Sequence, residues 1–138
     1  MTIFNMYIFD RSGVLVYYGE WNRRRQSGMT IDEVISLYFY TSCFLIYRFL
    51  FQEAKLMYGM LYSIKNFVSK MSPVDVTEGF QCYRTSKYML NYLETPSGVK
   101  YVMNTDLNAI SVRELLQLIN SQVSQCNHYK HIVINTTI

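Results

Sequence analysis

Few residues of this chain have types and spacing that suggest chemistry, and most of them lie near its C-terminal end. Cys126, His128 and His131 form the pattern Cys-x-His-x-x-His, which places three soft metal ligands close together. A structural zinc site needs four such ligands, and this spacing matches no usual zinc motif. We therefore expect no metal. The chain has only these two histidines, so any nucleophile with a histidine base would depend on this segment.

No other pattern indicates an enzyme or a cofactor. Gly13, Gly19 and Gly28 are too far apart to form a dinucleotide-binding loop, and no phosphate-binding loop or paired-carboxylate motif is present. Asn135-Thr136-Thr137 is a formal glycosylation sequon, but without a secretory signal it is expected to remain unmodified. We expect a protein that is not an enzyme and that has no catalytic residue and no cofactor.

The composition favours a single domain that buries surface against partners. The chain has 138 residues, of which half are apolar and 16% are aromatic, and 13 are tyrosines. Its net charge of +3 is too small to indicate nucleic-acid binding. Three cysteines at no motif spacing favour a reducing compartment. The one dense basic run, Arg23-Arg24-Arg25, is either a solvated loop or a contact with an anionic membrane or an acidic partner.

Apolar patterning predicts two strands, a helix, three strands and a second helix. β-Branched and aromatic residues predict strands at residues 3–9 and 14–18, joined by a short turn. Apolar residues at helical spacing predict a helix over residues 53–71, which Pro73 ends. The other predicted elements are strands at residues 80–85, 87–93 and 99–103, and a helix that begins at a capping box of Ser111 and Glu114. The predicted fold class is α+β: a two-layer domain with a five-stranded antiparallel sheet and the helices on one face.

The helix over residues 53–71 has two apolar stripes. The fuller stripe, which ends at Met71, is expected to face the sheet, together with side chains of the second helix; the expected core residues are Met57, Met60, Leu61, Ile64, Val68, Leu115, Leu116 and Ile119. The other stripe is incomplete, and it is either further core or a surface that contacts a partner. The residues of this candidate interface are Leu56, Tyr58, Tyr62 and Phe67.

An ordered set of short motifs resembles one protein family. The most specific motif is Lys55-Leu56-Met57-Tyr58-Gly59-Met60-Leu61. The other matching positions are residues 5–11, 13–14, 20–21, 63–64, 67–73, 75, 85–86, 88, 94–96, 98 and 102–106. The match covers residues 1–33 and 53–122 without a gap in either block. This pattern resembles the small core subunits of the transport protein particle (TRAPP), a vesicle-tethering complex.

The resemblance implies a longin (sedlin-like) fold and a role without catalysis. Subunits of the family associate side by side through helix and sheet surfaces. Their assembled core tethers vesicles in endoplasmic-reticulum-to-Golgi transport and acts as a nucleotide-exchange factor for a Rab GTPase. The implied partners are the other small TRAPP subunits and, through the assembled complex, the Rab. The implied location is cytoplasmic, with peripheral membrane association at the endoplasmic reticulum and cis-Golgi.

Two segments depart from the pattern of the family. The longin-like domain, residues 1–122, is interrupted by an apolar insertion at residues 34–52, and residues 123–138 form a divergent tail. One interpretation is a membrane span at residues 34–51, which makes a membrane-anchored longin-domain protein the alternative function. However, only 14 uncharged residues precede Arg48, and a span needs about 20. A native insertion is also awkward, because it separates the helix from its predicted capping box.

A third interpretation is that both segments are translated intron. Without residues 34–52, the capping box of Thr30 and Glu33 leads directly into Glu53. Every valine codon begins with GT, and Gln52 can be encoded as CAG, as expected at splice sites. Val123-Ser124 can likewise be encoded as GTAAGT, a strong 5′ splice site. On this hypothesis, the C-terminal helix of the family is missing because the tail is intron read-through.

Overall fold

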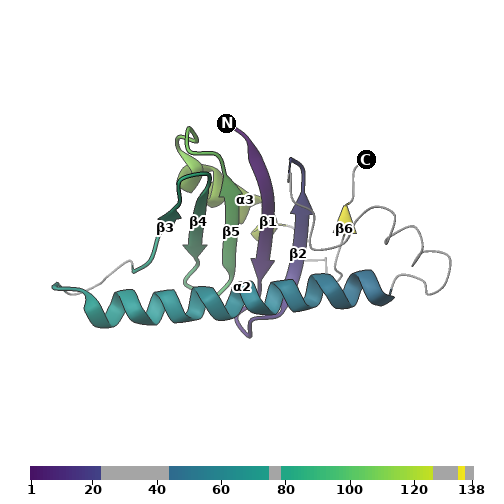
Figure 1. The fold of residues 1–138 in the computed structure, drawn as a ribbon, viewed down its shortest axis with the longest axis horizontal. Helices are drawn as coiled ribbons and strands as arrows, with labels where there is room; N and C mark the ends of the chain where they lie inside the picture. The colour runs from purple at the N-terminus through teal and green to yellow at the C-terminus, as the bar shows by residue number, and fades with distance from the viewer. Residues whose placement is uncertain (23–43, 75–78, 126–133, 136–138) are drawn as a thin grey trace.

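The computed structural model describes residues 1–22, 44–74, 79–125 and 134–135; for residues 44–50, 125 and 134–135 it describes the backbone alone. The elements in chain order are β1 (Ile3–Phe9), β2 (Leu15–Glu20), α2 (Phe44–Met71), β3 (Cys82–Arg84), β4 (Met89–Glu94), β5 (Lys100–Thr105), α3 (Val112–Gln125) and β6 (Ile134–Asn135). The strands form one sheet with the order β3-β4-β5-β1-β2-β6 (Figure 1). Neighbouring strands from β3 to β2 are antiparallel, and β6 pairs parallel to β2.

The sheet is buried on both faces at its centre. β1 lies between β5 and β2, with Tyr7 paired to Val102 on one side and to Tyr18 on the other. Successive residues of β1 alternate between two cores: Tyr7 and Phe9 belong to one cluster, and Met6 and Ile8 belong to the other. The near-continuous apolar run of this strand therefore reflects a central position with cover on both sides.

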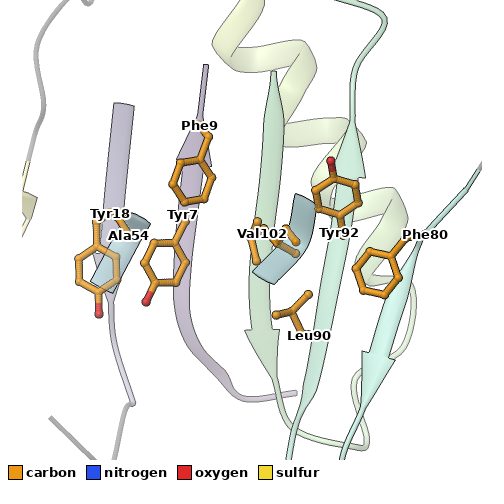
Figure 2. Close-up of a cluster of buried hydrophobic side chains, with 9 residues drawn as sticks. Tyr7, Phe9, Tyr18, Ala54, Phe80, Leu90, Tyr92 and Val102 are labelled. Carbon is orange, nitrogen blue, oxygen red and sulfur yellow. The ribbon is translucent and has the colours of Figure 1, made fainter. Parts of the chain in front are cut away.

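The two helices cover opposite faces, so the domain has three layers and not the predicted two. Ala54 and Leu61 of α2 pack on the cluster that contains Tyr7 and Phe9. Figure 2 shows Tyr7, Phe9, Tyr18, Phe80, Leu90, Tyr92 and Val102 of this cluster beside Ala54. Val112 and Leu116 of α3 pack instead on the cluster that contains Met6 and Ile8. The predicted α+β, longin-like class with five antiparallel strands is confirmed, whereas the placement of both helices on one face is wrong.

Local sequence explains the turns between the strands. The Asp10 carboxylate accepts hydrogen bonds from the backbone N–H groups of Ser12 and Val14, each at 2.9 Å. Burial alone would raise the pKa of Asp10, but these bonds and the Ser12 hydroxyl outweigh it and lower the pKa. Gly13 follows with a φ of 86°, a conformation that favours glycine. The predicted hairpin is therefore present, with β1 at its predicted bounds.

One strand is shorter than predicted, and another strand was not predicted at all. β3 has three residues where six were predicted, and all three are exposed at the edge of the sheet. β6 adds a strand that was not predicted, from within the divergent tail. α3 begins where its capping box was predicted, since the Leu115 N–H donates to the Ser111 carbonyl at 3.1 Å. Ser111 itself has a φ of 60°, outside the extended region that N-cap residues usually adopt.

α2 begins nine residues before its predicted start, because Phe44–Met71 form one helix of 28 residues. At 1.5 Å per residue its length is about 42 Å. The last nine residues of the apolar insertion thus extend the helix that packs on the sheet. The capping box of Thr30 and Glu33 lies outside the described residues, as does the rest of the insertion. Among the described helices, none is both long enough and apolar enough to cross a membrane.

Candidate interaction surface

Three of the four candidate interface residues lie on the exposed side of α2. The exposed fractions of Leu56, Tyr62 and Phe67 are 76%, 61% and 65%. The buried side of the same helix carries Ala54 and Leu61, each 2% exposed. At 3.6 residues per turn, Leu56 and Phe67 project within about 20° of each other, whereas Tyr62 points about 120° away from Leu56. The structure therefore divides the predicted interface into two flanks of one helix.

The larger flank is an apolar stripe along the outside of α2. We name it the outer stripe, and its residues are Leu56, Met60, Phe67 and Met71. Met60 and Met71 were predicted to face the core but are 38% and 67% exposed, because they lie on the outer edge of the helix face that Met57 and Leu61 bury. Fifteen residues separate the ends of the stripe, which is about 22 Å long. An exposed apolar stripe of this kind is typical of a surface that contacts a partner.

Gly59 lies beside this stripe in the middle of the helix. A Cβ atom added to Gly59 would have no neighbouring atom within 4 Å, so close packing inside the chain does not require glycine here. Glycine in a helix interior costs roughly 0.5–1 kcal/mol relative to alanine. Ser63 follows one turn later, so two small residues lie next to Leu56 and Met60 on the exposed side of the helix. Small residues at such positions let another helix approach closely.

Tyr58 lies on the sheet side and differs from the other three candidate residues. Its ring packs against Phe9, with 5.6 Å between the ring centroids. The Lys100 Nζ lies 5.6 Å from the centroid of the same ring, and Gly13 lies directly against it. Tyr58 is therefore a half-buried contact between α2 and the first hairpin. Its i,i+4 spacing to Tyr62 suggested a shared surface, but the two residues straddle the boundary between the buried and exposed sides.

An ion pair also fixes α2 to the sheet. The Lys65 Nζ lies 2.5 Å from a carboxylate oxygen of Glu94, which also accepts a hydrogen bond from the Tyr92 hydroxyl at 3.0 Å. Partial burial acts to raise the pKa of Glu94, but Lys65, Tyr92 and the charge of Lys100 outweigh it and lower that pKa. Burial, followed by the bond to Glu94, raises the pKa of Tyr92 well above its ordinary value. The cluster thus favours a charged Glu94 and a neutral Tyr92.

The residues with possible metal chemistry remain unplaced. Cys126, His128 and His131 lie outside the described residues. Within the described part of the chain, no group of three or more histidine, cysteine, aspartate or glutamate side chains is placed to hold a metal ion. Asn135 of the sequon lies in β6, and Thr136 and Thr137 lie outside the described residues.

Comparisons with known proteins agree with the resemblance found in the sequence. A model of the Sybindin-like family matches residues 3–133. Subunit 1 of the trafficking protein particle complex from Homo sapiens is 46% identical over 121 residues, which are 88% of this chain and 70% of that protein. The subunit of the same name from Dictyostelium discoideum is 36% identical over 123 residues, 88% of this chain and 72% of that protein.

A solved structure supports the fold independently of close sequence similarity. Myxococcus xanthus MglB superposes with a TM-score of 0.54 at 14% identity, over 90% of this chain and 82% of that chain. At this identity the likeness concerns the fold alone. The family match spans nearly the whole chain, and the human relative is matched over more than two thirds of its length. This chain therefore belongs to the Sybindin-like family.

Proposed function

We propose that this chain is a non-catalytic core subunit of a trafficking particle (TRAPP) complex. Its relatives from Homo sapiens and Dictyostelium discoideum carry the name of subunit 1 of that complex. The described residues supply an exposed apolar stripe on α2, which suits a protein that works by contact with other subunits. On this proposal, the chain supports vesicle tethering in endoplasmic-reticulum-to-Golgi transport. It contributes to the assembly of a Rab nucleotide-exchange factor, at membranes that the complex contacts peripherally.

The outer stripe carries the proposal, and we assign it the main contact with a neighbouring subunit. Leu56 and Phe67 are large apolar side chains that one helix presents to solvent over 11 residues, and a packed helix would bury both. Gly59 and Ser63 lie where such a helix would cross. Tyr62 lies on the other flank and serves as an internal comparison. A contact through the outer stripe depends on Phe67 but not on Tyr62.

The test is co-expression with the other small TRAPP subunits, followed by affinity purification of the complex. Phe67→Ser should reduce recovery of the partner subunits at least tenfold, which corresponds to a loss of about 1.4 kcal/mol or more of contact energy. Tyr62→Ser is the matched control, because it removes an aromatic ring of similar exposure from the same helix. Each variant should retain the thermal stability of the parent chain within about 0.5 kcal/mol, since both side chains are exposed.

Equal recovery of partner subunits with Phe67→Ser and the parent chain would refute the assignment of the outer stripe. Loss with Tyr62→Ser alone would move the contact to the other flank. Failure of the parent chain itself to co-purify with any TRAPP subunit would refute the proposed function as a whole.

A further inference from the structure

Both prolines of the chain directly follow a residue with a hydroxyl group. The two pairs are Ser72-Pro73 and Thr95-Pro96, and the chain has no other proline. A serine or threonine followed by proline is the minimal acceptor motif of proline-directed protein kinases, which transfer a phosphoryl group from ATP. In the sequence alone the two sites are equivalent. The structure describes both pairs and shows that their surroundings differ.

Thr95 is held inside the turn between β4 and β5. It is 8% exposed, and its hydroxyl bonds the Val99 carbonyl oxygen at 3.2 Å and the Val99 N–H at 3.1 Å. The backbone is closed as well, because the Thr95 N–H donates to the Val99 carbonyl and the Gly98 N–H donates to the Thr95 carbonyl, each at 2.9 Å. A kinase could reach this hydroxyl only by opening the turn that joins two central parts of the sheet.

Ser72 lies directly after the last residue of α2. In Figure 1, this end of α2 projects beyond β3, the edge strand of the sheet. Ser72 is partly exposed, and its neighbours Met71 and Val74 are 67% and 72% exposed. Because proline disfavours the helical conformation for the residue before it, Pro73 biases Ser72 towards the extended conformation. A protein kinase binds its acceptor segment in this conformation.

The hydrogen bonds of the Ser72 hydroxyl are local. The hydroxyl donates to the Val74 carbonyl oxygen at 2.6 Å and accepts from the Val74 N–H at 3.3 Å. Both bonds lie at the surface and join residues two positions apart, so they can open without breaking a contact between α2 and the sheet. Water can replace Val74 as the partner during this opening. The Ser72 hydroxyl is therefore the more accessible of the two acceptors.

We propose that Ser72 is a phosphorylation site for a proline-directed kinase, and that its phosphorylation weakens the contact through the outer stripe. In the reaction, the Ser72 Oγ attacks the γ-phosphorus of ATP, and the bond from this phosphorus to the bridging oxygen breaks. ADP leaves with the bond electrons, and the hydroxyl proton passes to a base of the kinase. The site itself concerns the isolated chain, whereas its effect on assembly rests on the proposed function.

The phosphate would lie at the end of α2 where negative charge is least favourable. The last carbonyl groups of a helix lack intrahelical donors and form the negative end of its dipole. Phosphoserine adds a charge of about −1.5 to −2 at pH 7 and removes the proton that is donated to Val74. Lys70, the basic residue of the last turn, offsets only part of this charge. Met71 and Phe67 of the outer stripe lie in the last two turns, so a charge and a weakened helix end beside them disfavour an apolar contact.

The first experiment incubates the full chain with ATP and a recombinant proline-directed kinase, and mass spectrometry measures the rate at each site. Synthetic peptides of residues 67–78 and 90–101 are the unfolded references, and the kinase is one that modifies both. The ratio of the rate in the folded chain to the rate in the peptide should be at least tenfold higher for Ser72 than for Thr95. Pro73→Ala keeps the hydroxyl and should lower the rate at Ser72 at least tenfold. Equal ratios at the two sites, or no modification of Ser72 in the folded chain, would overturn the proposal.

The second experiment compares recovery of partner subunits by co-purification. The chain phosphorylated at Ser72 should recover at least threefold less of these subunits than the unmodified chain, and phosphatase treatment should restore recovery. Ser72→Ala is the matched control, because it removes the bonds to Val74 without adding charge, and it should assemble like the parent chain. An equal loss with Ser72→Ala would refute the charge argument, and equal recovery with and without the phosphate would refute the effect on assembly.

These outcomes are distinguishable from failure of the proposed function. If the phosphate has no effect on assembly, the proposed function still stands, because its own test depends on Phe67. If the parent chain does not co-purify with any TRAPP subunit, the proposed function is refuted together with the effect on assembly. Phosphorylation of Ser72 in the isolated chain would then still stand on the first experiment.

Discussion

Substitution of Gly13 by alanine tests the contact between the first hairpin and α2. Gly13 has a φ of 86°, and a Cβ atom added there would lie 2.6 Å from Cζ and 2.8 Å from Cε1 of the Tyr58 ring. The backbone conformation alone costs about 1–2 kcal/mol for a residue with a side chain. Displacement of the packed ring adds about 1–3 kcal/mol. Gly13→Ala should therefore lower the free energy of unfolding by about 2–5 kcal/mol.

A double-mutant cycle separates the two causes. In a Tyr58→Ala background the ring is absent, so Gly13→Ala should cost only the backbone part, about 1–2 kcal/mol. The free energies are measured by urea unfolding, followed by far-ultraviolet circular dichroism. Gly59→Ala is the matched control, since a Cβ atom there meets nothing within 4 Å, and it should stabilise the chain by about 0.5–1 kcal/mol. An equal cost of Gly13→Ala in both backgrounds would show that Tyr58 does not cover Gly13.

Further predictions concern the core, the ion pair, Gly59 and the insertion. Leu61→Ala should cost about 2–5 kcal/mol in urea unfolding, because Leu61 is 2% exposed and packs against the sheet. Folding lowers the pKa of Glu94, so the stabilisation that its carboxylate contributes is present above its ordinary pKa of 4.5 and is lost as pH falls through the folded pKa. In Glu94→Gln, the free energy of unfolding should therefore depend less on pH over this acidic range. Urea unfolding at several pH values measures this difference. Gly59→Ala should weaken co-purification of partner subunits despite stabilising the isolated chain, and unchanged recovery would count against a close helix contact at Gly59. Removal of residues 34–52 should increase soluble expression and leave assembly at least as strong, whereas loss of assembly in the shortened chain would show that the insertion is native and functional.

Local patterns predicted the elements better than their arrangement. The bounds of β1 were predicted because six of its seven residues are β-branched, aromatic or apolar, and the strand ends at the turn signal of Asp10. Periodicity also identified the buried face of α2 around Leu61. The sequence could not show that α2 and α3 take opposite faces of the sheet. The signal for this arrangement was that successive residues of β1 are apolar. Met6 and Ile8 face one side of the sheet and Tyr7 and Phe9 face the other, so a helix is needed on each face to bury them.

The candidate surfaces show the same limit. Leu56 and Phe67 were predicted to be accessible to a partner, and their shared flank follows from a spacing of 11 residues. Tyr58 shares a helix with them but is held by Phe9 and Lys100, which are distant in the sequence.

The central position of β1 has a consequence for synthesis of the chain. Tyr7 pairs with Val102, so the sheet cannot close until the ribosome has made about 95 more residues. At ordinary elongation rates this interval lasts roughly 5–20 s. During that time the first hairpin has an apolar strand with an unpaired edge, which is a hazard for aggregation. The nascent chain therefore depends on rapid capture of β1 by β5, and changes that slow translation before residue 105 should lower the yield of folded protein.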